Sequence, residues 1–244
     1  MTYFSDDFIN DFLKTALAED GNTVKPERPK FNFGPASKDE TSIYGSSKPE
    51  HSYNSISAES IQEWVDYVKS QGISGVLCLL EKHSLDMIYK MTGVNLIDRY
   101  RKEFGNENVM LAPVPDFSYI SRDTFTKSIL PFLKKFADTD RKVVVHCAGG
   151  IGRTGQILAA WLTHGRGYDI EDAIDAVKMA SPALRNPQEA GIGYFGEIDS
   201  LRTLLDVSGN EHRYSETTGK KPFKNTNTYN NSDLDKWLFG IDRG

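Results

Sequence analysis

The chain has 244 residues, of which 39% are hydrophobic and 26% are charged, a balance typical of one ordinary globular domain with extensions. Its net charge of −5 argues against a general nucleic-acid or membrane-surface binder, because such proteins carry a positive surface. The sequence has no apolar run as long as a membrane span and no signal-peptide pattern at its start. It therefore predicts a soluble, cytoplasmic protein.

The first 52 residues fall into two parts. Residues 4–19 place apolar side chains at helical spacing and predict a short amphipathic helix. Residues 20–52 are rich in Pro, Gly, Ser, Lys and Glu, so we expect irregular chain there.

A globular pattern begins near residue 53. An apolar stripe from Ile61 to Val68 predicts a helix, and residues 73–80 predict a buried strand. The pattern then predicts helices at 84–104, 121–137 (bent at Pro131), 156–162, 170–180 and 188–206, and strands at 108–114 and 142–145. Strands that alternate with helices favour an α/β fold, with a central, mostly parallel sheet flanked by helices. Residues 207–232 predict a mobile polar tail, followed by a small apolar group at 234–241.

The two cysteines, Cys78 and Cys147, are too few for a disulfide framework, and no Cys/His cluster has the spacing of a zinc site. In a reducing compartment both are expected to remain thiols. Cys78 lies in an apolar strand, where a small core residue is the simplest interpretation. The alternative is a redox partner that forms a disulfide with Cys147 under oxidation.

The segment after the strand at 142–145 has the residues that a phosphate site requires. Cys147 stands at the end of the strand, and a Gly-rich turn leads into a helix. Glycines let the backbone curl tightly, so that several N–H groups point inward in front of the helix N-terminus. A helix N-terminus and a nearby cation favour the thiolate, which is the nucleophilic form of cysteine. Arg153 supplies that cation, and its planar fork can hold two phosphate oxygens.

The run His146-Cys147-(five residues)-Arg153-Thr154 resembles the signature of the protein tyrosine phosphatase superfamily. The resemblance covers about residues 41–206, the size of the compact dual-specificity branch, and residues 43–49 resemble the start of the domain in compact members. It implies a phosphatase that works through a phosphocysteine intermediate without metal or cofactor. Cys147 would be the nucleophile and Arg153 the clamp, Thr154 would hydrogen-bond the thiolate, and His146 would orient the loop. The backbone amides that would cradle the phosphate belong to Ala148, Gly149, Gly150, Ile151, Gly152 and Arg153.

The family also uses a general acid, usually an Asp on a loop some thirty to forty residues before the cysteine. Asp116, in the Pro-bounded segment 113–117, stands thirty-one residues before Cys147 and fits this role by resemblance. Asp123 is the second candidate. Val114 replaces the Trp of the classical form of this loop.

A second loop in the family positions the hydrolytic water, often with a Gln. Residues 181–188 lie at the corresponding place, which makes Gln188 the candidate. Arg185 in the same segment is interpreted either as a second phosphate contact or as a solvated side chain.

The resemblance divides the chain into an N-terminal extension at 1–40, a phosphatase-like domain at 41–206 and a polar tail at 207–244. Positions 148–151 carry no lysine, whereas inositol-lipid phosphatases of this superfamily tend to place basic residues there. This favours a phosphorylated protein as substrate, with phosphotyrosine alone or together with phosphoserine or phosphothreonine. No nucleic-acid partner is expected, because the net charge is negative. The alternatives are an RNA 5′-triphosphatase, a small-molecule or lipid phosphatase, and an inactive phosphate-binding module. The oligomeric state stays open.

A rival interpretation starts from Gly150 to Gly155, which match the G-x-G-x-x-G fingerprint of dinucleotide-binding folds. That fold requires a second strand ending in an acidic residue about 20 residues further on. Residues 169–180 have helical spacing instead, which argues against it.

Overall fold

The computed structural model describes residues 29–50, 55–180, 182–191 and 198–208, and its centre is a five-stranded sheet. The strand order is β1-β2-β5-β3-β4, with β1 antiparallel to β2 and the other neighbours parallel. The strands are β1 (Gly34–Pro35), β2 (Ile43–Ser46), β3 (Ile73–Cys78), β4 (Val109–Leu111) and β5 (Lys142–His146). The predicted α/β class with a mostly parallel sheet is confirmed.

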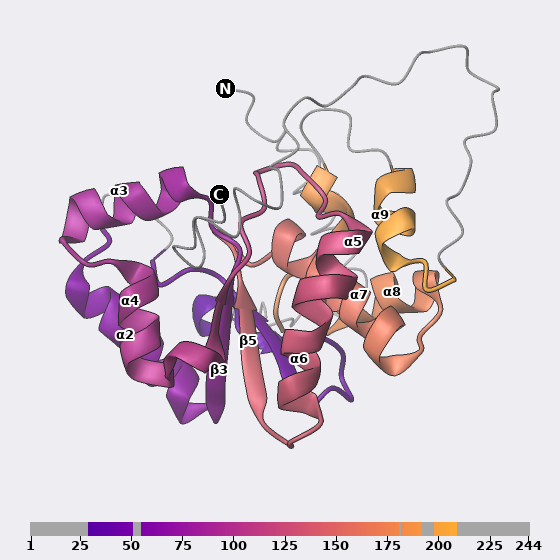
Figure 1. Cartoon of the computed structure of the whole chain (residues 1–244), viewed down its shortest axis with the longest axis horizontal. Helices are drawn as coiled ribbons and strands as arrows, with labels where there is room; N and C mark the ends of the chain where they lie inside the picture. The colour runs from indigo at the N-terminus through magenta and orange to yellow at the C-terminus, as the bar shows by residue number, and fades with distance from the viewer. Residues whose placement is uncertain (1–28, 51–54, 181, 192–197, 209–244) are drawn as a thin grey trace, which may run out of the picture.

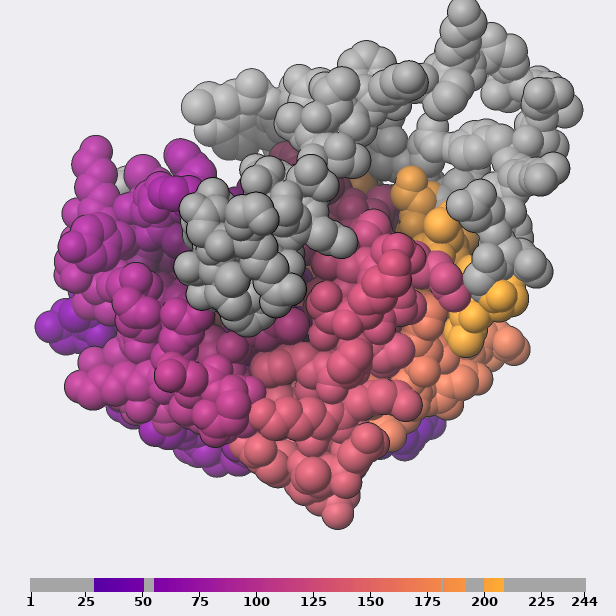
Figure 2. Space-filling view, viewed as in Figure 1, coloured from indigo at the N-terminus to yellow at the C-terminus, as the bar shows by residue number. Residues whose placement is uncertain are grey.

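Helices cover both faces of this sheet (Figure 1). One face carries α2 (Ala58–Ser70), α3 (Lys82–Thr92) and α4 (Leu96–Phe104). The other carries α5 (Arg122–Thr124), α6 (Leu130–Ala137), α7 (Gly152–Arg166), α8 (Ile170–Met179) and α9 (Ile198–Leu205). Short turns are η1 (Lys30–Asn32), η2 (Asn106–Asn108) and η4 (Pro187–Gly191), and a π segment, η3 (Phe125–Ile129), joins α5 to α6. Figure 2 shows the magenta α3–α4 side and the rose α6 side as adjoining surfaces.

The local sequence explains the best-defined elements. Ser57 and Ser60 form a reciprocal capping box that starts α2, and the predicted stripe from Ile61 to Val68 is buried beneath that helix. In β5 the side chains alternate between two apolar cores, as the two-residue period of a strand requires. Val143 and Val145 pack on the α7 side, and Val144 packs on the α2 side.

Several elements differ from the sequence-based expectation. The segment 20–52, expected as irregular, contains β1 and β2. These strands are too short to show a periodic pattern, and they form because β2 pairs with β5 and β1 pairs with β2. The expected helix over 84–104 is two helices, because Gly93 ends α3 in the left-handed conformation, with φ of 68°. Pro131 lies in the first turn of α6, directly after the π segment, where its missing N–H costs no regular helical bond.

Other expectations lie partly or wholly outside the described residues. The helix expected at 188–206 appears as η4 and α9, with 192–197 not described. The helix expected at 4–19 and the tail beyond residue 208 are also not described. Within the described ranges, no helix has both the length and the apolar character that a membrane crossing requires.

Candidate active site

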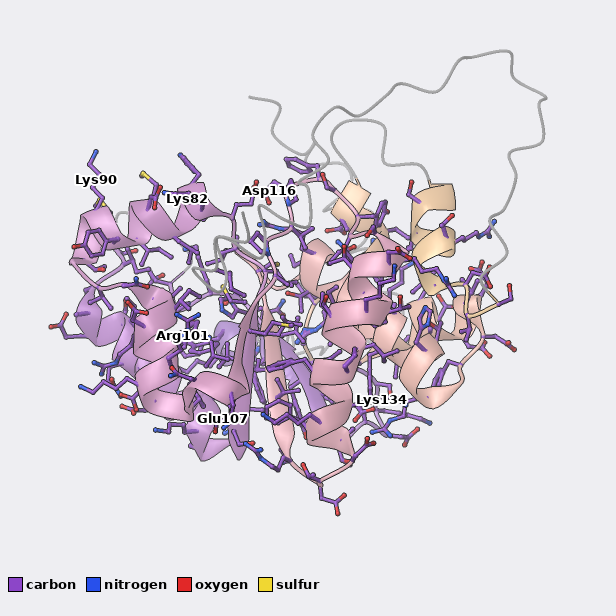
Figure 3. The ribbon with its side chains drawn as sticks, in the orientation of Figure 1. Lys82, Lys90, Arg101, Glu107, Asp116 and Lys134 are labelled. Carbon is purple, nitrogen blue, oxygen red and sulfur yellow. The ribbon has the colours of Figure 1, made fainter. Side chains whose placement is uncertain are left out.

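Three parallel strands end at the same edge of the sheet and build the base of the site. Ser46 of β2 and Cys78 of β3 are both register partners of His146, the last residue of β5. Cys147 therefore follows the central strand at the carboxyl edge, where ligands of α/β folds commonly bind. Figure 3 places Asp116 at this end of the molecule, near Lys82 at the start of α3, and Glu107 at the opposite end.

The loop from Cys147 to the start of α7 closes around the sulfur. Cys147 is 3% exposed, and its Sγ accepts hydrogen bonds from the Gly150 N–H at 3.3 Å and the Thr154 hydroxyl at 3.2 Å. Gly150 has a φ of +74°, and a Cβ there would lie 2.6 Å from the Ser46 backbone. Glycine is therefore required at this position for both conformation and space.

Arg153 connects the loop to the predicted acid. Its guanidinium is 5% exposed, donates to the Val114 carbonyl at 3.0 Å and pairs with the Asp116 carboxylate at 2.5 Å. The Asp116 side chain is 59% exposed, so it lies at the mouth of the site. Asp123 instead pairs with Lys127 on the exposed surface of α5. The structure thus brings Asp116, and not Asp123, to the arginine of the loop.

Two residues that sequence reasoning missed hold the segment that carries Asp116. Glu81, at the N-cap of α3, accepts the Asp116 backbone N–H at 3.2 Å. Gln156, buried on α7, accepts from the Ile120 N–H at 2.8 Å and donates to the Ser118 carbonyl at 3.0 Å. A polar side chain within the otherwise apolar run of α7 was the available signal for Gln156, because buried polar groups are retained where they are hydrogen-bonded.

His146 lies behind the loop as a fully buried, neutral side chain. Its Nδ1 lies 3.3 Å from the Cys147 carbonyl, and its ring packs edge-on to Trp64 and Tyr100. Burial, together with the positive charges of Lys48 and Arg153, lowers the pKa of His146 to about 4. The imidazole is therefore uncharged where it contacts the Cys147 carbonyl.

The structure does not bring the side chain of Gln188 to the loop. Its Oε1 accepts from Lys178 Nζ at 2.6 Å, and its backbone carbonyl accepts from the Tyr119 hydroxyl. The backbone of η4 does pack against the loop, because a Cβ on Gly152 would lie 2.6 Å from the Ala190 nitrogen.

Both interpretations of Arg185 were wrong. The side chain is 4% exposed and donates to the carbonyls of Asn32, Gly34 and Gly45, so it neither binds phosphate nor faces solvent. A Cβ on Gly45 would lie 2.7 Å from this guanidinium, which explains the glycine. Burial lowers the pKa of Arg185 to about 10.

Cys78 is confirmed as a core residue. It is fully buried, and burial raises the pKa of its thiol to about 12. It packs with the core on the α2 side, whereas Cys147 packs with the core on the α7 side, and both thiols are free. Over the described ranges, no group of three or more His, Cys, Asp or Glu side chains is arranged to hold a metal ion.

Comparisons with known proteins show what this chain is similar to. Residues 51–166 match the family model described as "Polymorphic toxin system, DSP-PTPase phosphatase". The human "Dual specificity protein phosphatase 8" is 30% identical over 125 residues, a match that spans 45% of this chain and 20% of that protein. This chain thus spans about one fifth of the length of that curated relative.

Solved structures share the fold. The kinase associated phosphatase, solved with its catalytic site cysteine replaced by serine, superposes with a TM-score of 0.52 and 19% identity, covering 68% of this chain and 92% of that one. The structure of PTPMT1 in complex with PI(5)P superposes with a TM-score of 0.50 and 14% identity, and the match covers 71% of this chain and 92% of that one. At such identities the likeness establishes the fold alone. The matched segment, the human relative and the shared fold together support a dual-specificity-like member of the protein tyrosine phosphatase superfamily.

Proposed function

We propose that this phosphatase removes phosphate from proteins, at phosphotyrosine and also at phosphoserine or phosphothreonine, through a phosphocysteine intermediate. The observation that carries the proposal is the arrangement around Cys147. Two donors contact its sulfur, and Arg153 joins the same loop to the Asp116 carboxylate.

In the first step, the Cys147 thiolate attacks phosphorus and the bond to the leaving oxygen breaks. The donors from Gly150 and Thr154 favour the charged sulfur before the attack. Asp116, in its protonated form, donates its proton to the departing oxygen. Arg153 exchanges the Asp116 carboxylate for two oxygens of the transferring group, which it can hold with its planar fork.

In the second step, water attacks the phosphorus of the phosphocysteine and the P–S bond breaks. Asp116, now a carboxylate, takes the proton from that water, and inorganic phosphate leaves. Thr154 donates to the sulfur as it regains its negative charge. The loop amides and Arg153 stabilise the equatorial oxygens in both steps, which is the main source of rate in phosphoryl transfer.

The choice of a protein substrate is supported by the uncharged loop positions 148–151, which offer no cation to a second phosphate group. Phe117, beside the acid, is 54% exposed and presents an aromatic surface at the mouth of the site. Such a surface suits contact with the ring of a phosphotyrosine.

A panel of phosphotyrosine peptides, phosphothreonine peptides, phosphoinositides and 5′-triphosphate RNA tests the substrate class with purified protein. We expect the highest kcat/KM on phosphotyrosine peptides, measured as phosphate release. A higher value on phosphoinositides or on 5′-triphosphate RNA would overturn the protein assignment. Binding of a phosphopeptide without turnover of any substrate would favour the inactive binding module.

The covalent step has its own test. Acid quenching during turnover of a ³²P-labelled phosphopeptide should leave label on the Cys147 peptide of the wild type. The Cys147→Ser variant should show no turnover and should retain phosphopeptide binding. Phosphate release by this variant would rule out the phosphocysteine route.

A further inference from the structure

We propose that Asn32, which precedes the sheet, is a positioning residue of the phosphate loop. Its side chain fixes two peptide groups of the loop so that their N–H groups face the Cys147 sulfur and the phosphate-binding space. The effect on catalysis rests on the proposed function, whereas the effect on the thiol does not require any substrate.

The side-chain amide of Asn32 is fully used. Its Nδ2 donates to the carbonyls of Gly149 and Gly150 at 3.3 Å each and to the Leu184 carbonyl at 2.8 Å. Its Oδ1 accepts from the Leu184 N–H at 2.7 Å. An amide nitrogen has two hydrogens, so one serves Leu184 and the two loop carbonyls share the other. One side chain therefore joins the phosphate loop to the segment before η4.

The two loop contacts determine where the following N–H groups point. In a trans peptide the C=O and the next N–H point in opposite directions. Because the Gly149 carbonyl points to Asn32, the Gly150 N–H points away from it, and this N–H is the one found on the Cys147 sulfur at 3.3 Å. The Gly150 carbonyl also accepts from the Asn32 side chain, so the Ile151 N–H in the same peptide group points away from Asn32.

Asn32 is itself held firmly in place. Its φ of +50° is in the left-handed region, which Asn tolerates better than most residues. Its N–H bonds to the Pro29 carbonyl at 2.9 Å, and its own carbonyl accepts from the buried Arg185 guanidinium at 2.9 Å. The neighbouring Phe31 carbonyl accepts from the Ser47 N–H at 2.7 Å. The amide therefore projects from a fixed backbone, as positioning a catalytic loop requires.

The consequence for Cys147 follows from charge. Donors on a sulfur favour the thiolate over the thiol. Releasing the Gly149 and Gly150 carbonyls from Asn32 frees the Gly150 N–H to turn away from the sulfur, and the thiolate loses one donor.

Two variants test this role, with one matched control. Asn32→Asp keeps the acceptor for Leu184 but turns a negatively charged oxygen towards the loop carbonyls. Asn32→Gly removes the side chain and tolerates the positive φ. Asn108→Asp makes the same chemical change in a buried Asn whose Nδ2 also donates to a backbone carbonyl, that of Phe104. Asn108 adjoins Glu107, which Figure 3 places at the end of the molecule opposite Asp116.

The readout is the rate of Cys147 alkylation by iodoacetamide from pH 4.5 to 9, followed by mass spectrometry of the Cys147 peptide. Cys78 is fully buried and does not compete in the folded protein. In both Asn32 variants we expect Cys147 to be alkylated more slowly than in the wild type, by about tenfold at the acidic end of this profile, because the sulfur has lost a donor. Asn108→Asp should keep the wild-type profile even where its melting temperature falls.

Each outcome decides the proposal. Profiles of folded Asn32 variants that overlay the wild type would overturn it, and an equal slowing in Asn108→Asp would do the same. If Asn32→Asp does not fold, Asn32→Gly decides. Failure of both to fold, with Asn108→Asp folded, would mean that Asn32 holds the domain rather than the loop, and would also overturn it. Slower alkylation in the Asn32 variants with no wild-type turnover on any substrate would reject the proposed function and leave the role of Asn32 standing.

Discussion

The guanidinium of Arg153 has one partner that substrate must replace. It contacts the Val114 carbonyl and the Asp116 carboxylate, both from the segment that carries the acid. A phosphate group that enters the loop meets an arginine already oriented by these contacts. The same contacts keep its charge paired until substrate arrives.

Arg153→Lys should therefore be nearly as damaging as Arg153→Ala. Lysine keeps the charge but cannot hold two phosphate oxygens at once. It also lacks the planar guanidinium that contacts the Val114 carbonyl and the Asp116 carboxylate together. We expect kcat to fall by about a hundredfold or more in both variants. Arg202→Lys, an exposed arginine of α9, is the matched control and should retain full activity. Near-normal kcat in Arg153→Lys would mean that this side chain does not clamp the phosphoryl group.

Asp116→Asn tests the acid. The change should lower kcat on a phosphotyrosine peptide by about 10²–10⁴-fold, because the leaving oxygen loses its proton donor. The loss should shrink with an aryl phosphate whose phenol is acidic, because that group departs without protonation.

Asp123→Asn is the control, because the Asp123 carboxylate forms an exposed ion pair with Lys127. A leaving-group-dependent loss in Asp123→Asn and none in Asp116→Asn would reverse the two assignments.

Helix α7 begins at the phosphate loop and also holds the segment that carries the acid. Through Gln156, its first turns also hold Ser118 and Ile120, on the far side of Asp116 from Val114. The Val114 N–H donates a hydrogen bond to the carbonyl of Leu79, directly after β3, at 3.1 Å. The acid segment is thus fixed on both sides of Asp116.

Gln156→Leu should misplace the acid without touching the nucleophile. It leaves the Ile120 N–H and the Ser118 carbonyl without their partner. We expect kcat to fall by about ten- to a hundredfold, with KM changed much less. The loss should depend on the leaving group in the same way as that of Asp116→Asn. Gln62→Leu on α2 is the matched control, and a loss that is equal for all leaving groups would contradict this role.

The strand, loop and helix around Cys147 could be predicted because their information is local. A β-branched run, a glycine turn and an apolar helix follow one another in sequence, and the spacing from Cys147 to Arg153 is short. Asn32, Glu81 and Arg185 could not be predicted, because each acts on backbone atoms of a distant segment. A hydrogen bond to a backbone carbonyl or N–H leaves no pattern in the sequence of the segment that supplies that backbone group.

Gln188 is the converse case, a candidate suggested by its position in the sequence alone. Its place in the chain corresponds to the loop that positions the hydrolytic water in this family. Its side-chain oxygen, however, accepts a hydrogen bond from Lys178 of α8. Position in the sequence does not determine the side-chain direction in a short 3₁₀ turn. We retain the backbone of η4, rather than this side chain, as the part that packs against the phosphate loop.

For the whole molecule, the described N-terminal segment is part of the fold. Glu40 is buried, and its carboxylate accepts from Trp161 and Arg166 of α7 and from the Ser42 N–H. Burial raises the pKa of Glu40, but the hydrogen bonds from Arg166, Trp161 and the Ser42 N–H, together with the charge of Arg166, lower it overall. We therefore propose that the domain begins before residue 41 and includes at least residues 29–40.

Stability should depend on pH through His146. Its pKa falls from 6.5 to about 4 on folding, so the unfolded chain binds the proton more readily. The stability from the neutral side chain is complete above about pH 6.5 and is lost as the pH falls towards 4. The loss should reach about 2.5 kcal/mol between pH 7.5 and pH 4.5, measured by urea unfolding.

The His146→Asn variant is the comparison for this prediction. It should be less stable at neutral pH, because the ring packing with Trp64 and Tyr100 is lost. Its free energy of unfolding should also change less between pH 6.5 and 4.5. The pH dependence that remains comes from other groups such as half-buried His164, because burial lowers the pKa of that side chain as well. A wild-type free energy of unfolding that stays constant over this range would contradict a buried neutral His146.

The hydrogen bond between Asn32 and Leu184 joins residues 152 positions apart in the chain. Closing so large a loop is entropically costly, and contacts of this kind tend to form late in folding. On the ribosome, the nucleophile and Arg153 are synthesised before Leu184 emerges. We therefore expect a nascent or prematurely ended chain to carry the whole catalytic signature while its loop still lacks this contact. The enzyme would gain full activity only when the polypeptide is long enough to bring its two distant segments together.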